Sequence, residues 1–158
     1  GEWNTAWSDE PTSVMSRTGY VILFANCPII WSSKLQTEIA LSTTEAEYIA
    51  LSQSLRDVIP LVALLKELRR TAPHNSSVPT LHCTVHEDNQ GCIDLVNAPR
   101  IRPRTKHIAL KYHHFRKHVR EGLVSVRYVE TDRQMADIFT KALGDVKFAT
   151  LRRMMMGW

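Results

Sequence analysis

Three acidic residues in this chain have apolar sequence neighbours, where a carboxylate needs an ion-pair partner or a bound cation. Glu47 lies in the first turns of an expected helix, Asp88 ends an expected strand, and Asp137 lies early in a later helix. Each has apolar neighbours, and an ionised carboxylate is costly to desolvate unless it is paired or binds a cation. These residue types are typical of a hard-metal site for phosphate chemistry, with Mg²⁺ or Mn²⁺ as the ion.

A second glutamate competes with Glu47 for this role. Ser42-x-x-Glu45 has the form of a capping box, in which the two side chains satisfy the first amides of a helix. The capping box explains Glu45 locally and leaves Glu47 without a local explanation. We therefore prefer Glu47 as the candidate ligand.

The elements that must position these acids follow from periodicity and turn signals, and they predict an α/β domain with a mixed sheet. Two apolar runs at 18–24 and 28–33 predict an antiparallel hairpin. The helix that begins at Ser42 is expected to reach about Asp57, where Pro60 either kinks it or starts a second segment to Arg70. The remaining expected elements are a strand at 81–87, helices at 89–96 and about 108–122, a strand at 123–129, a helix that follows Thr131 and includes 135–142, and a C-terminal tail helix within 144–158.

The helix expected to carry Asp137 has its own start signal. Thr131-x-x-Gln134 forms a second potential capping box. Helical spacing predicts that one side of this helix is buried, through Met135, Ile138, Phe139 and Ala142.

Positive charge is concentrated between Arg100 and Arg120, a stretch without a carboxylate. Such a segment is either a phosphate-contacting surface or a solvated helix face, and the residues alone do not decide between them. His114 and His118 have zinc-pair spacing within it, but no HExxH glutamate or nearby cysteine supports a zinc site. Its basic residues are Arg100, Arg102, Arg104, Lys106, Lys111, Arg116, Lys117 and Arg120.

The composition is that of an ordinary globular domain. The 158 residues, 44% hydrophobic and 23% charged, predict one domain over 1–158. We expect no membrane association, because no apolar stretch approaches the ~20 residues of a bilayer span. Cys27, Cys83 and Cys92 lack metal-site spacing, which favours reduced, buried thiols. Reduced thiols are typical of intracellular proteins, so we expect an intracellular location.

Several motifs, in order along the chain, resemble the ribonuclease H domain of copia-type retrotransposon polyproteins. The resemblance extends from about Ser16 to Trp158. It is carried by Trp31-Ser32-Ser33-Lys34-Leu35-Gln36, Ala40-Leu41-Ser42-Thr43-Thr44-Glu45-Ala46-Glu47-Tyr48, Asp88-Asn89-Gln90, Arg104-Thr105-Lys106-His107-Ile108 and Ala136-Asp137-Ile138-Phe139-Thr140-Lys141-Ala142-Leu143.

The resemblance implies a ribonuclease H-like mixed sheet flanked by helices and a metal-dependent activity. The reaction would be hydrolysis of the RNA strand of an RNA–DNA hybrid, next to the reverse-transcriptase part of the same polyprotein. Glu47, Asp88 and Asp137 match the family's second, third and fourth metal-binding carboxylates. The resemblance also favours nucleic-acid contacts by Asn89, Gln90, Arg104, Lys106 and His107.

The sequence departs from the family at its start. In the family, a first strand with an Asp-x-Asp motif precedes the position of Gly1, and its leading aspartate binds metal. We therefore expect this chain alone to lack one ligand and a central strand, and to cleave weakly or not at all. Two alternatives to an active nuclease are an inactive remnant that only binds nucleic acid and a structural part of the polyprotein.

Overall fold

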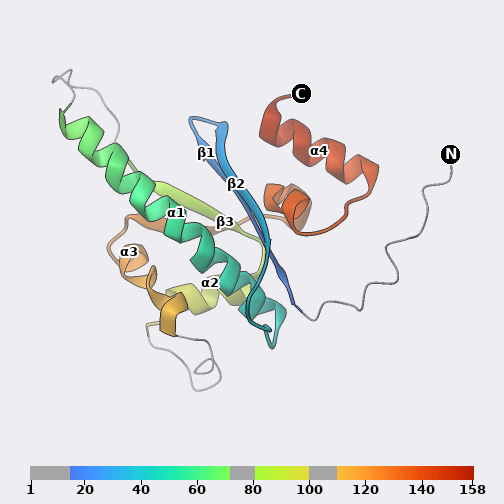
Figure 1. Cartoon of the computed structure of the whole chain (residues 1–158), viewed down its shortest axis with the longest axis horizontal. Coiled ribbons are helices and arrows are strands. Elements are labelled where there is room, and N and C mark those ends of the chain that lie inside the picture. The colour runs from blue at the N-terminus through green and yellow to red at the C-terminus, as the bar shows by residue number, and fades with distance from the viewer. Residues whose placement is uncertain (1–14, 72–80, 100–109) are drawn as a thin grey trace.

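The strands in the described part of the chain form two small sheets. The computed structural model describes residues 15–71, 81–99 and 110–158. Within them, β1 (Arg17–Phe24) pairs antiparallel with β2 (Cys27–Leu35), and β3 (Cys83–Glu87) pairs parallel with β4 (Val124–Tyr128). Four helices accompany these strands, so the expected α/β class is confirmed (Figure 1).

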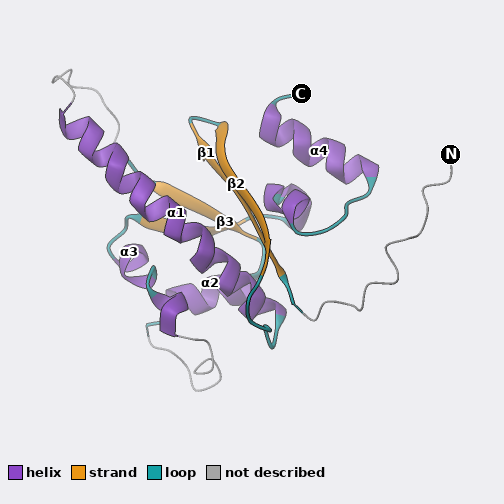
Figure 2. Ribbon diagram, viewed as in Figure 1, coloured by secondary structure: helices purple, strands orange, loops and turns teal. Residues whose placement is uncertain are grey.

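The expected single mixed sheet is not formed by the described residues. Each sheet has two strands, and β1 makes no ladder with β3. A cavity lined by residues of both strands lies between them, so their facing edges are not bridged by backbone hydrogen bonds. Figure 2 shows the β1–β2 hairpin and β3 as separate ribbons beside α1 (Thr43–Thr71).

The predicted hairpin is confirmed, and its turn is tight. Ala25 and Asn26 have φ of 51° and 62°, as in the turns whose twist matches paired strands. The strand that follows begins at Cys27, whose side chain is exposed. The expectation that all three cysteines are buried is therefore wrong for Cys27, because it borders this exposed turn.

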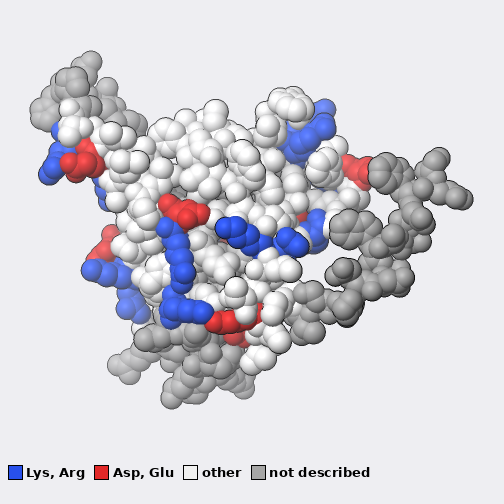
Figure 3. Space-filling model, in the orientation of Figure 1, with Lys and Arg blue, Asp and Glu red and all other residues white. Residues whose placement is uncertain are grey.

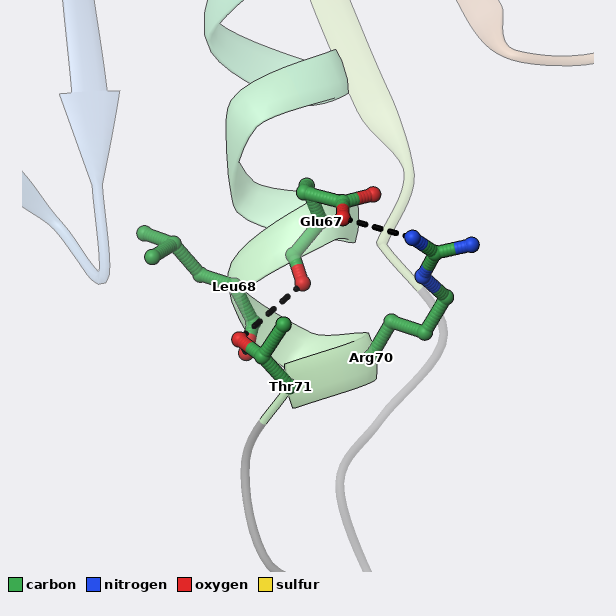
Figure 4. A network of polar contacts seen from close by, with 4 residues as sticks. All are labelled: Glu67, Leu68, Arg70 and Thr71. Carbon is green, nitrogen blue, oxygen red and sulfur yellow. Dashed lines mark hydrogen bonds and ion pairs between the residues drawn. The ribbon is translucent and has the colours of Figure 1, made fainter.

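Helix α1 runs through Pro60 without interruption over 29 residues. Proline removes one helical hydrogen bond, but Val58 and Val62 on either side are buried in the core and hold the helix in place. At the far end, Arg70 pairs with Glu67 at 2.7 Å and the Thr71 hydroxyl donates to the carbonyl of Leu68 at 3.0 Å (Figure 4).

By length and composition, α1 could also cross a membrane, which corrects the expectation that no stretch approaches that size. Half of the most apolar 18-residue stretch of α1 is buried inside the structure. Tyr48 and Leu55 on this helix have no exposed surface, and they pack with Phe115 and Val124 in the core. The apolar face of α1 is thus explained as that of a core helix.

The segment after residue 109 is less regular than predicted. Instead of one helix to about 122, it forms a 3₁₀ turn, η2 (Leu110–His113), and a short helix, α3 (Arg116–Arg120). The His114 ring lies 3.3 Å from the carbonyl of Lys111, where it competes with helical backbone bonding. The preceding short helix, α2 (Gln90–Asn97), begins as predicted, with the Asn89 side chain accepting from the amide of Cys92.

The segment that carries Asp137 is a pair of 3₁₀ turns rather than the predicted α-helix. The turns are η3 (Thr131–Arg133) and η4 (Met135–Phe139). The Gln134 side chain donates to the carbonyl of His86 instead of completing a capping box. Ser33 donates to the carbonyl of Phe139 at 2.6 Å, which removes that acceptor from helical bonding.

The expected apolar side of this segment is also wrong in part. Met135, Ile138 and Phe139 are half-buried, Ala142 is exposed, and Asp137 is the buried residue. The terminal helix α4 (Asp145–Met156) forms as expected and buries Leu151 completely.

Candidate active site

Glu47 occupies the second turn of α1, next to a fully formed helix start. The Ser42 hydroxyl accepts from the amide of Glu45 at 3.1 Å, and the Glu45 carboxylate accepts from the amide of Leu41 at 2.9 Å. The predicted capping role of Glu45 is therefore confirmed. Glu47 has no part in these hydrogen bonds and is half-buried.

Asp88 directly follows β3, beside a second acid that the sequence reasoning missed. Glu87 is 5% exposed and accepts from the amide of Asn89 at 3.0 Å. Burial, together with the charges of Glu47 and Asp88, raises the pKa of Glu87 to about 7, against the opposing hydrogen bond from Asn89. The alternation of β3 could have revealed it, because Cys83, Val85 and Glu87 share the inward face.

Asp137 is held by two lysines. Its Oδ2 lies 3.0 Å from the Nζ of Lys141 and 2.9 Å from the Nζ of Lys147, while its side chain is 9% exposed. The hydrogen bond to Asp137 is the largest cause of a raised Lys147 pKa, and the charges of Asp132 and Asp88 also contribute. Lys141 lies within a recognised motif, but only the packing of α4 against η4 reveals the role of Lys147.

The three predicted acids line one cavity. Glu47, Asp88 and Asp137 come from α1, the end of β3 and η4, and all three line a space of about 580 Å³. Burial raises the pKa of Glu47, the negative charges of Asp88 and Asp137 raise it further, and Lys141 opposes the shift. The tertiary structure therefore brings the three carboxylates into one electrostatic environment.

These acids do not by themselves form a metal site. The parts of the chain that the structure describes contain no group of three or more His, Cys, Asp or Glu side chains that could hold an ion. Asp137 already has two ammonium groups at its Oδ2. The oxygen donors suit Mg²⁺ or Mn²⁺ chemically, but the described set does not fit a bound metal as it stands.

Three known proteins that are similar to this chain are Pol polyproteins of plant transposons. The chain is 35% identical over 147 residues, 93% of its length, to the retrovirus-related Pol polyprotein from transposon RE2 of Arabidopsis thaliana. It is 35% identical over 144 residues, 90% of its length, to the corresponding polyprotein from transposon RE1 of the same plant. Its homologues are retrotransposon Pol polyproteins.

A third relative supports the same assignment. The Pol polyprotein from transposon TNT 1-94 of Nicotiana tabacum is 38% identical over 133 residues, 84% of this chain. The chain spans only about a tenth of these relatives, 9–10% of their length. No protein-family model matches the chain, and no solved structure does.

The expected nucleic-acid contacts of this polyprotein segment are only partly described. Gln90 is exposed and donates to Asp94 at 2.9 Å, and Asn89 is half-buried as the cap of α2. Arg104, Lys106 and His107 lie outside the described residues.

Basic residues later in the predicted phosphate-binding segment have partners within the protein. Lys111 pairs with Glu38, and Lys117 lies 3.7 Å from Glu121. Arg116 is buried and donates to the carbonyl of Ala98, while Arg120 donates to the carbonyl of Pro99 at 3.0 Å. Among the described residues in Figure 3, Lys and Arg are interspersed with Asp and Glu, so this face shows no extended basic surface.

Proposed function

We propose that this chain is the ribonuclease H domain of a copia-type retrotransposon Pol polyprotein, acting inside the cell. Its reaction would be cleavage of the RNA strand of RNA–DNA hybrids. The observation that supports this most is the shared cavity of Glu47, Asp88 and Asp137, in a chain 35–38% identical to Pol polyproteins. The acids arrive there from three separate elements, matching the expectation from the motifs.

The domain would require Mg²⁺ or Mn²⁺ and a further carboxylate. The requirement rests on donor chemistry, because carboxylate oxygens are preferred ligands of these hard cations. The three described acids are an incomplete ligand set. The missing carboxylate would come from the Asp-x-Asp strand expected upstream of Gly1.

The space between β1 and β3 supports an upstream strand. The two strands flank the cavity, which is also lined by Leu61, Val62 and Leu65 of α1. Apolar side chains below and backbone edges on both sides are the surroundings of a central sheet strand. A strand inserted there would end beside Asp88 and Glu47 and would join the two sheets into one.

The test is hydrolysis of a labelled RNA–DNA hybrid in Mg²⁺ or Mn²⁺. The chain extended by its polyprotein residues before Gly1 should cleave the RNA strand and leave DNA duplex intact, because recognition of the 2′-hydroxyl separates the two substrates. The 158-residue chain alone should be at least about 10²-fold slower, since small displacements of reacting groups already cost that much.

Three single variants of the extended chain test whether each of the three acids is needed for cleavage. Glu47→Gln, Asp88→Asn and Asp137→Asn should each abolish most of the cleavage, whereas Glu45→Gln should keep it because glutamine also serves in a capping box. Cleavage by Asp137→Asn at the rate of the unmodified chain would refute the assignment. Hybrid binding without cleavage by the extended chain would support the inactive remnant instead.

A further inference from the structure

The ion pair between α4 and Asp137 links the C-terminal helix to the acidic cavity. Lys147 comes from the first turn of α4, and its side chain is 27% exposed. Lys141 belongs to the segment that carries Asp137 and is 52% exposed. Lys147 is thus the more enclosed of the two lysines, and its position depends on how α4 packs.

Helix α4 is fixed in place by packing as well as by this ion pair. Leu151 on the same helix is completely buried, and α4 contacts both η4 and β2. The helix ends at Gly157, whose amide donates to the carbonyl of Arg153 and whose φ is +83°. Docking of α4 therefore delivers the Lys147 ammonium to Asp137.

A divalent cation and the Lys147 ammonium would compete for the negative charge of the Asp137 carboxylate. Mg²⁺ lies ~2.0–2.1 Å from its ligand oxygens, so an ion on Asp137 would be a close neighbour of the Nζ that lies 2.9 Å from Oδ2. Their charges also repel strongly in a partly enclosed site. We propose that Lys147 is an internal competitor for divalent cations at Asp137, so that docking of α4 lowers the cation affinity of the acidic site.

This inference rests on the proposed function only in taking Asp137 as a cation ligand. Asp137 is already paired with the Lys147 ammonium, which is the charge that a cation there would meet. Binding is reciprocal, so a cation that displaces Lys147 must in turn weaken the docking of α4.

The first experiment measures Mn²⁺ binding by calorimetry to the whole chain and to the chain extended upstream. Lys147→Met, which keeps the apolar stem, should bind Mn²⁺ about tenfold more tightly, within the usual range for coupled sites. Lys147→Gln is a second variant in case the first folds poorly. Arg152→Met removes the same charge from the same helix, where Arg152 lies over the ring of Trp158, and should leave Mn²⁺ affinity unchanged.

The second experiment measures hydrogen exchange in α4 with and without saturating Mn²⁺. Mn²⁺ should speed exchange in the unmodified chain and have no effect on α4 in Lys147→Met. Equal Mn²⁺ affinities, or no binding to any variant, would overturn the inference. If Lys147→Met and the unmodified extended chain bind Mn²⁺ equally and both cleave hybrid, the inference fails and the proposed function stands. If Lys147→Met binds Mn²⁺ more tightly but no variant cleaves hybrid, the inference stands and the proposed function fails.

Discussion

Glu87 is the more buried of the two acids at the end of β3. Its burial follows from the alternation of inward and outward side chains along the strand. Glu87 points to the same side as Cys83 and Val85, and it lines the cavity together with the neighbouring Asp88. The two acids differ in exposure, because Glu87 is buried and Asp88 is half-buried. The amide of Asn89 provides one hydrogen bond to the buried carboxylate.

We predict that Glu87 makes the protein less stable as pH rises. Its pKa is raised from 4.5 to about 7, so the folded state holds the proton more tightly than the unfolded chain. The stabilising contribution is complete below pH 4.5 and is lost as pH rises through about 7. Glu87→Gln should remove a pH dependence on the order of 2 kcal/mol.

Urea unfolding at pH 5 and pH 8, in buffer containing a chelator, measures this difference. Glu130→Gln, which removes an exposed carboxylate, serves as the control and should keep the pH dependence of the unmodified chain. A pH dependence that survives in Glu87→Gln would place its source at another group.

At the scale of elements, the position of Asp137 depends on close contact between η4 and β1. A Cβ added to Gly19 would lie 2.5 Å from the Thr140 side chain and 2.9 Å from the Cβ of Phe139. The backbones approach closely only because β1 has no side chain at this point. This contact holds the 3₁₀ turn, and with it Asp137, beside the cavity.

We predict that Gly19→Ala destabilises the protein by about 1–3 kcal/mol, the usual cost of overpacking. In the extended chain it should also reduce hybrid cleavage, because η4 must move to admit the methyl group. Gly144→Ala is the matched control, since Gly144 has a φ of −63° and nothing within 4 Å of the added Cβ. Thermal unfolding that is equal for the two variants would show that η4 adjusts without cost.

At the scale of the whole molecule, the two sheets of the described residues flank the cavity lined by Glu47, Asp88 and Asp137 without joining across it. The extended chain should unfold in urea with a free energy higher by roughly 3 kcal/mol or more, because a central strand adds backbone hydrogen bonds worth about 1 kcal/mol each and buries apolar surface. An extension of equal length with the strand residues scrambled is the control. Equal stability of the two extended chains would mean that no strand enters between β1 and β3.

Nucleic-acid binding is also a property of the whole charged surface. Four basic residues later in the segment have protein partners, so we expect the earlier Arg104 and Lys106 to contribute most of its phosphate binding. Arg104→Ala with Lys106→Ala should weaken hybrid binding and reduce the slope of log affinity against log salt by roughly 2. The control is Arg69→Ala with Arg70→Ala, which removes equal charge at the C-terminal end of α1. It should change neither the affinity for the hybrid nor the salt slope.

The sequence alone determined the features that depend on neighbours along the chain. The hairpin, the capping box of α1, the cap of α2 and the extent of α4 all follow from local turn chemistry and periodicity. These interactions span only a few residues, so the residue types in each segment suffice to specify them. The identity of the candidate acids came from motifs that resemble a known family.

Only the tertiary structure decided what those acids face. The same local signals failed at η4, where contacts to Ser33 and Gly19 replaced the predicted helix and left Asp137 buried. They could not show that Glu47, Asp88 and Asp137 line one cavity, or that Lys147 of α4 pairs with Asp137. Such contacts join segments distant in sequence, and their energies depend on packing and burial that periodicity does not encode.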